Sequence, residues 1–355
     1  MVLDSSASMR QTGESPALTS KPRQPDHSGP CYRRMIKLVR VEREKPGRWM
    51  ELLDLARRFK ARVAGRWRER NWIPAWTSPG EQSFLTNYAT RDYTGTGEIV
   101  DLGCLLGATT LALGRGLQAN TGISRKAGRI HSYDRFLWEE AFSELPGGFS
   151  RHYEPGDSFF SEFQSRTSRF SRLIKAYPGD ITKFGWHGDP IEFLLVDVNK
   201  SWELCEFLGK NFYPYLLVND SFVFEQDFKH YYTPWVHILG YRLRSVLRPS
   251  CDLAGTCSFV FRPIKSIDPA MVPSAEEMKA VSSEELDEIY RLSLSLIPNG
   301  MAWEKANVIS SKVMFYIHQN RMSEAHAVFD AAMTEGFTID SDLKVCARLL
   351  GRASA

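Results

Sequence analysis

Two glycines and an acidic residue stand together near residue 100 in a pattern that could bind a nucleotide. Asp101, Gly103 and Gly107 follow a short apolar run, and a helix-like run begins directly after Gly107. A strand that turns through glycine into a helix presents backbone N–H groups and the positive end of the helix dipole to a ligand. The sequence therefore predicts a nucleotide-type site at this turn.

The spacing of these residues distinguishes between classes of nucleotide. A dinucleotide site has three glycines in the pattern G-x-G-x-x-G, with an acid about 20 residues further on that binds the ribose. Here only Gly103 and Gly107 are present, and the ribose-type acid, Asp134, lies 31 residues after Gly103. A ligand without a pyrophosphate fits this spacing better. An NAD(P)-dependent dehydrogenase is the weaker alternative.

Polar residues also follow the other predicted strands. The carboxyl ends of parallel strands meet at one edge of a doubly wound sheet, where ligands bind. Each residue alone has an ordinary alternative as a turn or helix cap, but the ordered series favours a site. These residues are Asp180 after the third strand, Asp197, Asn199 and Lys200 after the fourth, and Gln226 and Asp227 after the fifth.

Alternating apolar and polar runs predict the elements that would position these side chains. Residues 191–198 form a continuous apolar run, which is typical of a strand covered on both faces. Strands that alternate with helical patterns indicate a doubly wound α/β sheet. We expect strands at 98–102, 129–134, 173–177, 191–198 and 221–227, helices at 159–172 and 201–216, and an antiparallel pair at 242–247 and 256–261, joined by a turn that contains Pro249.

These motifs resemble those of the class I S-adenosylmethionine-dependent methyltransferases, whose first motif has the form acid-x-Gly-x-x-x-Gly. Residues 100–110, 193–203 and 222–228 are similar to a branch of small-molecule and sugar O-methyltransferases that includes the macrocin O-methyltransferase-like enzymes. The similarity covers about residues 81–263. It implies an α/β fold: a doubly wound, Rossmann-like seven-stranded sheet with a terminal antiparallel β pair, to which this chain adds helical N- and C-terminal parts.

The resemblance implies S-adenosylmethionine as the cofactor and gives five residues a role in binding it. Gly103 and Gly107 would let the backbone pass close to the methionine moiety and the ribose. Asp101 would be oriented towards the ammonium group of the cofactor. Asp134 would accept hydrogen bonds from both ribose hydroxyls, and Asp180 would accept one from the adenine amino group.

For the methyl acceptor, the resemblance directs attention to Asp197, Asp227 and His230 as catalytic residues. Enzymes of this branch commonly hold a divalent cation with acids after the fourth and fifth strands, which lowers the pKa of the acceptor hydroxyl. This sequence has Asn199 and Gln226 where further acids would be expected. Three alternatives follow: Mg²⁺ held by Asp197 and Asp227, a metal-free reaction with His230 as the base, or a degenerate methyltransferase fold that serves as a binding scaffold.

Composition restricts the class of protein. The chain has 355 residues and a formal net charge of +3, which gives no whole-chain argument for nucleic acid or an anionic membrane. The six cysteines are scattered without a C-x-x-C pair, and no run approaches the roughly 18 apolar residues of a membrane span. We therefore expect a cytoplasmic protein with reduced thiols and no membrane insertion.

Four segments are expected along the chain. Residues 1–30 predict a disordered tail, 31–80 a basic helical segment, 81–265 the methyltransferase domain and 266–355 a helical C-terminal segment. The basic segment is typical of a solvated helix face, so nucleic acid is not the expected partner. We expect a small-molecule methyl acceptor, and the C-terminal helices could support a homo-oligomer or a protein contact.

Overall fold

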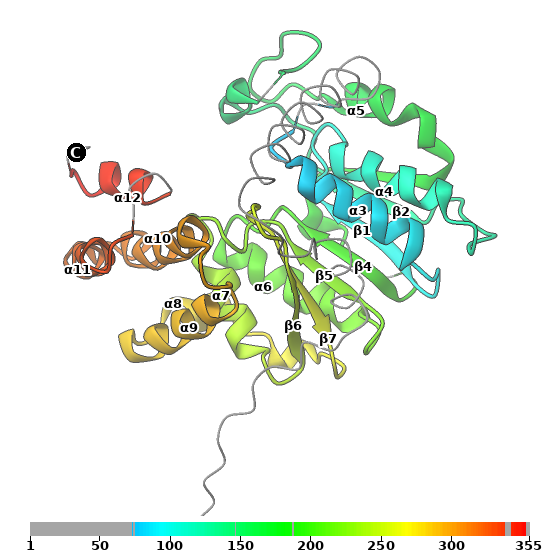
Figure 1. Cartoon of the computed structure of the whole chain (residues 1–355). Coiled ribbons are helices and arrows are strands. Elements are labelled where there is room, and N and C mark those ends of the chain that lie inside the picture. The colour runs from blue at the N-terminus through cyan, green and yellow to red at the C-terminus, as the bar shows by residue number, and fades with distance from the viewer. Residues whose placement is uncertain (1–72, 74, 146, 187, 338–341, 353–355) are drawn as a thin grey trace, which may run out of the picture. The chain divides into compact units, whose positions relative to one another are not determined.

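The computed structural model describes residues 73, 75–145, 147–186, 188–337 and 342–352 (Figure 1). The predicted tail at 1–30 and the predicted basic helices before residue 73 lie outside these residues.

A seven-stranded sheet is the centre of the described part of the chain. Its strands are β1 (Glu98–Leu102), β2 (Ile130–Asp134), β3 (Ile174–Pro178), β4 (Ile191–Val196), β5 (Phe222–Glu225), β6 (Leu247–Asp252) and β7 (Phe259–Pro263). They lie in the order β3-β2-β1-β4-β5-β7-β6. The first five are parallel, β7 is antiparallel to β5, and β6 is antiparallel to β7. The predicted Rossmann-like sheet with a terminal antiparallel pair is confirmed.

Helices cover both faces of this sheet and form the C-terminal part of the chain. They are α3 (Pro79–Arg91), α4 (Ala108–Ala119), α5 (Phe160–Thr167), α6 (Trp202–Asn211), α7 (Pro234–Arg242), α8 (Ala275–Lys279), α9 (Ser283–Ser295), α10 (Ala302–His318), α11 (Met322–Thr334) and α12 (Leu343–Leu349). Among the described residues, no helix has both the length and the apolar character needed to cross a bilayer.

Neighbouring side chains of the central strands are buried on opposite faces of the sheet. Ile99 of β1 packs with α3 and α4, whereas Val100 packs with residues of α6 and α7. Figure 1 shows α3 and α4 on one side of the sheet and α6 on the other. Every residue of β1 and of β4 is buried. This two-sided cover explains why the sequence of β4 is a continuous apolar run.

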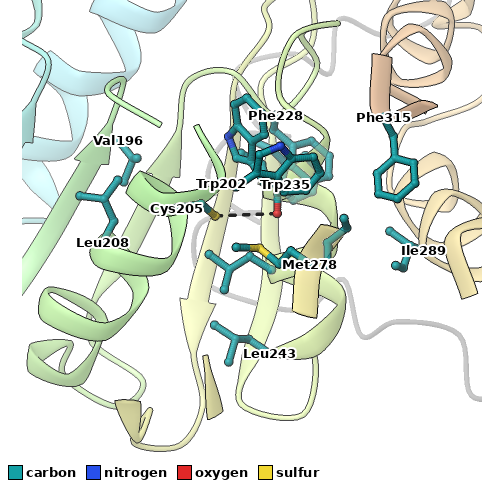
Figure 2. Close-up of a cluster of buried hydrophobic side chains, with 14 of the residues drawn as sticks. Val196, Trp202, Cys205, Leu208, Phe228, Trp235, Leu243, Met278, Ile289 and Phe315 are labelled. Atoms are coloured by element: carbon teal, nitrogen blue, oxygen red, sulfur yellow. Dashed lines mark hydrogen bonds between the residues drawn. The ribbon is translucent and has the colours of Figure 1, made fainter. Parts of the chain in front are cut away.

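One large cluster of buried side chains joins the sheet to the C-terminal helices (Figure 2). Trp202 of α6 meets Trp235 of α7 and Phe315 of α10 edge-on, with ring centroids 5.2 and 5.9 Å away. Met278 and Ile289, from α8 and α9, belong to the same cluster. The C-terminal segment consists of helices, as predicted. Its buried side chains share one hydrophobic core with the sheet.

A buried lysine adds a polar link between the same parts. Lys229, just after β5, has no exposed surface, and its Nζ lies 2.6 Å from Asp252 Oδ1 and 3.1 Å from Glu304 Oε2. Its Nζ also donates to the carbonyl of Leu253 at 3.1 Å. Glu304, in the first turn of α10, accepts the N–H of Gly255 with its other oxygen at 2.6 Å. The loop after β5, the β6–β7 hairpin and α10 are thus joined around one buried charge.

The predicted strand at 242–247 is wrong. Helix α7 continues to Arg242, and β6 begins only at Leu247, so it includes the Pro249 that was expected in a turn. Strand β6 lies at the edge of the sheet, where a residue without an N–H is tolerated, and its register shifts between Pro249 and Cys251.

Two predicted helices end earlier than expected. Helix α5 ends at Thr167 and α6 at Asn211, and each is followed by a 3-10 turn, at Ser168–Leu173 and Tyr213–Tyr215. The tighter turns keep the same apolar spacing over a few residues, so periodicity alone does not mark where the α-helix ends.

Replacing Glu304 with Gln should destabilise the fold, because it removes one carboxylate from the buried ammonium of Lys229. Breaking a buried ion pair costs roughly 3–5 kcal/mol, and we expect the lower end because Asp252 remains. Urea unfolding measures the loss. The control is Glu324→Gln, whose partly exposed pair with Arg321 should contribute much less to stability than the buried pair. Equal losses in both variants would contradict the buried link.

Candidate functional site

The glycine turn after β1 has a backbone that glycine favours. Gly103 and Gly107 have φ angles of 88° and 91°. A Cβ atom on Gly103 would lie 2.8 Å from the carbonyl oxygen of Asp197, and one on Gly107 would lie 2.5 Å from Cγ2 of Thr167. Helix α4 then begins without a hydrogen bond from any described capping side chain. The turn therefore lies against the end of β4 and directs the N-terminus of α4 to this edge of the sheet.

Asp134 joins the loop after β1 to the loop after β2. Its two carboxylate oxygens accept the backbone N–H groups of Leu105 and Phe136, at 2.8 and 2.7 Å. Leu105 and Phe136 have positive φ angles of 45° and 52°, a conformation that costs energy in residues other than glycine. Desolvation raises the pKa of Asp134, although these two hydrogen bonds oppose the shift. Each oxygen has a further acceptor position, which a ribose hydroxyl could use.

Asp101 lies deeper than its predicted role would require. It has no exposed surface, and its oxygens accept hydrogen bonds from Thr110 Oγ1 at 2.6 Å and Thr109 Oγ1 at 3.0 Å. Burial raises the pKa of Asp101 to about 6, against the effect of the two hydroxyls. In this structure Asp101 stabilises the junction between β1 and the first turn of α4. Its orientation towards a cofactor ammonium stays a prediction.

Asp180 is exposed at the exit of β3. Its Oδ1 accepts the N–H and the hydroxyl of Thr182, at 3.0 and 2.8 Å, and these bonds lower its pKa. Sequence reasoning missed the aromatic residue beside it. Phe184 is 38% exposed, and its ring meets Tyr133 and Tyr177 edge-on at centroid distances of 6.2 Å. Phe184 is thus a partly exposed aromatic surface next to the predicted adenine-binding residue.

At the ends of β4 and β5, a lysine lies between two carboxylates. Asp197 is the first residue after β4, and Asp227 is the second after β5. Lys200 Nζ lies 3.2 Å from Asp197 Oδ1 and is also hydrogen-bonded to Asp227 Oδ2. The structure therefore brings together the two acids that the sequence placed at neighbouring strand ends, with an ammonium group between them.

The charges of this group act on one another. Desolvation raises the pKa of Asp197, while the attraction of Lys200 opposes this shift and the charge of Asp227 adds to it. Desolvation acts on Asp227 too, but Lys200 and His230 more than offset it and lower the pKa of that carboxyl. Desolvation would lower the pKa of Lys200, yet the two carboxylates raise it. Lys200 is therefore a stable cation.

The surrounding side chains do not match the magnesium site that the resemblance implied. The described residues contain no group of three or more His, Cys, Asp and Glu side chains that could hold a metal ion. Asn199 and Gln226 stand where further acids were expected, and their side-chain oxygens are buried without a hydrogen-bond partner in the described structure. The cation beside Asp197 and Asp227 is Lys200. Two carboxylates already paired with an ammonium are a poor donor set for Mg²⁺.

His230 lies on the loop that carries Asp227, where its backbone N–H donates to the Asp227 carbonyl. Its Nδ1 accepts the N–H of Tyr232 in a long hydrogen bond of 3.4 Å. The N–H of Tyr231 donates to Asp342 Oδ2 at 2.9 Å. Asp342 lies just before α12 and is 111 residues away in sequence, so strand-end patterns could not have indicated it.

Comparison with known proteins identifies similar solved structures only. No family model and no curated protein matches the sequence. The O-methyltransferase NovP is 16% identical, with 52% of this chain and 80% of that chain covered and a TM-score of 0.39. An O-methyltransferase from Bacillus cereus in complex with SAH is 13% identical, with coverages of 65% and 96% and a TM-score of 0.35. A putative O-methyltransferase from Klebsiella pneumoniae is 11% identical, with coverages of 66% and 95% and a TM-score of 0.36.

The strand order itself defines the fold. Five parallel strands in the order β3-β2-β1-β4-β5, with an antiparallel β7 between β5 and β6, match the sheet that the sequence resemblance implied. The chain has the class I methyltransferase fold. In this methyltransferase fold, the glycine turn and the Asp197–Lys200–Asp227 group lie at the carboxyl ends of adjacent strands.

Asp101→Asn should remove a pH dependence from the stability of the methyltransferase fold. Because the pKa of Asp101 is raised from 3.8 to about 6, the native state binds a proton more tightly than the unfolded chain. Wild-type stability should therefore fall as the pH rises from about 4 through about 6, by about 3 kcal/mol from this group. Urea unfolding of both proteins across this range measures the effect. If the difference in unfolding free energy between the two proteins stayed constant across this pH range, the prediction would be contradicted.

Proposed function

We propose that this chain is an S-adenosylmethionine-dependent methyltransferase that transfers a methyl group to a hydroxyl of a small molecule. The observation that carries the proposal is the glycine turn of a class I sheet, with Asp134 joining the loops after β1 and β2. Gly103 and Gly107 have the backbone that such a turn requires. A dinucleotide site would need a third glycine, which the sequence lacks.

The residues at this turn fit the chemistry of the cofactor. Asp134 offers carboxylate oxygens to ribose hydroxyls, and the N-terminus of α4 offers backbone N–H groups. Asp180 would accept a hydrogen bond from the adenine amino group. The partly exposed ring of Phe184 would pack against the face of the adenine. When bound, S-adenosylmethionine would supply an electrophilic methyl group on a positively charged sulfur.

The acceptor would lie at the neighbouring strand ends. The backbone of Gly103 lies against the carbonyl of Asp197, so the cofactor turn and the charged group of Asp197, Lys200 and Asp227 are adjacent. A base at this edge would take the proton of the acceptor hydroxyl, and the oxygen lone pair would then be free to accept the methyl group that the cofactor supplies. Asp197, directly after β4, and His230, on the loop after β5, are the candidate bases.

Binding of S-adenosylhomocysteine should raise the melting temperature of wild-type protein. A ligand at 100 times its dissociation constant stabilises a fold by about 2.7 kcal/mol, which is several degrees for a chain of this size. Asp134→Ala should abolish the shift, and Asp134→Asn should reduce it, because the amide replaces one acceptor by a donor. Differential scanning fluorimetry measures all three proteins.

The control is Asp157→Ala, which removes an exposed carboxylate that also accepts a backbone N–H, that of Glu154 at 3.0 Å. This variant should keep the full shift. Stabilisation by NADH in place of S-adenosylhomocysteine would replace the proposal with a dehydrogenase.

A degenerate methyltransferase fold that serves as a scaffold is distinguished from an active enzyme by the absence of methyl transfer, since both would bind the cofactor. It would show the same S-adenosylhomocysteine shift but no transfer of labelled methyl groups from S-adenosylmethionine to a broad panel of hydroxylated compounds, with or without Mg²⁺. Transfer to any member of the panel that Asp134→Ala abolishes would exclude the scaffold.

A further inference from the structure

The ammonium of Lys200 lies where two strand-end carboxylates would otherwise share a metal ion. It bonds to Asp197 Oδ1 and Asp227 Oδ2, whose side chains are 24% and 15% exposed. The side chain of Lys200 itself is 50% exposed. The side chain of Lys200 is therefore the most exposed of the three, and the two acids are less accessible than the lysine that bonds to them.

The donors of Lys200 are not all used by this pair. An ammonium has three N–H donors, and the two carboxylates take two of them. Within the described residues, the third has no partner. A hydroxyl oxygen that approaches this edge could therefore receive a hydrogen bond from a cation, which is the interaction that a bound metal would otherwise provide.

Asp197 and Asp227 contribute two carboxylates to this position. Asn199 and Gln226 are close to these acids in the sequence, and their side-chain oxygens are buried without partners in the described structure. Carboxylate and amide oxygens are ligands for hard divalent cations. With the ammonium present, a divalent ion would be repelled by a like charge in direct contact with both acids.

We propose that Lys200 is a built-in replacement for a divalent cation, so that the acceptor edge works without a metal until this lysine is removed. The inference rests on the proposed function only for the identity of the acceptor edge. It goes beyond that function because it gives Lys200 a role and because it predicts that Asp197 and Asp227 bind a divalent cation only when this lysine is absent.

Titration calorimetry with MnCl₂ alone tests the proposal on the full chain. Wild-type protein and Lys200→Arg should show no saturable uptake, because both keep a cation between the acids. Lys200→Met should show saturable binding of one Mn²⁺ per chain, because it uncovers the carboxylates. The double variant Lys200→Met with Asp197→Asn should lose that binding. The matched control is Lys210→Met, which removes an ammonium paired with Glu206 and should bind no Mn²⁺.

Two results would overturn the proposal. One is stoichiometric Mn²⁺ uptake by wild-type protein that Asp227→Asn abolishes, which would mean that the metal displaces Lys200. The other is the absence of uptake by Lys200→Met when its melting temperature shows that it is folded. S-adenosylhomocysteine shifts on the same samples keep the two hypotheses apart: no shift in any protein would overturn the proposed function, while the Mn²⁺ result would still decide the role of Lys200.

Discussion

Negative charge at the carboxyl edge of a parallel sheet must be compensated, and the rest of the site depends on how this is done. Burying a carboxylate without a partner is costly. Asp101 is compensated by two threonine hydroxyls and Asp134 by two backbone N–H groups. Asp197 and Asp227 share a lysine. Each kind of partner leaves a different number of free oxygen and N–H positions for a ligand, and on the proposed function this divides the edge into a proposed cofactor part and a proposed acceptor part.

The compensation also determines which elements become rigid. Because Asp134 bonds to Leu105 and Phe136, it holds two loops in left-handed backbone conformations that neither residue would adopt freely. Asp101 similarly holds the first turn of α4 against β1. The proposed cofactor part of the edge is therefore preorganised by its own carboxylates.

The proposed acceptor part is supported by the C-terminal helices. Lys229 and Tyr231 lie on the loop that also carries Asp227 and His230, and they bond to Glu304 and Asp342. The apolar cluster around Trp202 and Trp235 continues into α10 (Figure 2). These helices are therefore part of the support of the acceptor edge, and changes in them should be expected to act on it.

The sequence by itself determined where the parallel strands lie along the chain, the glycine turn and the acids at the strand ends, because apolar runs and glycine spacing are local properties of the chain. It did not determine β6, since an edge strand with exposed polar residues and Pro249 has the composition of a turn. Only the tertiary structure decided that Lys200 lies between Asp197 and Asp227, that Lys229 meets Glu304, and that Asp342 reaches Tyr231. The physical reason is that the partners of charged groups are the residues nearest in space. Asp342 and Tyr231 are 111 residues apart in the sequence, and no local pattern records such a pairing.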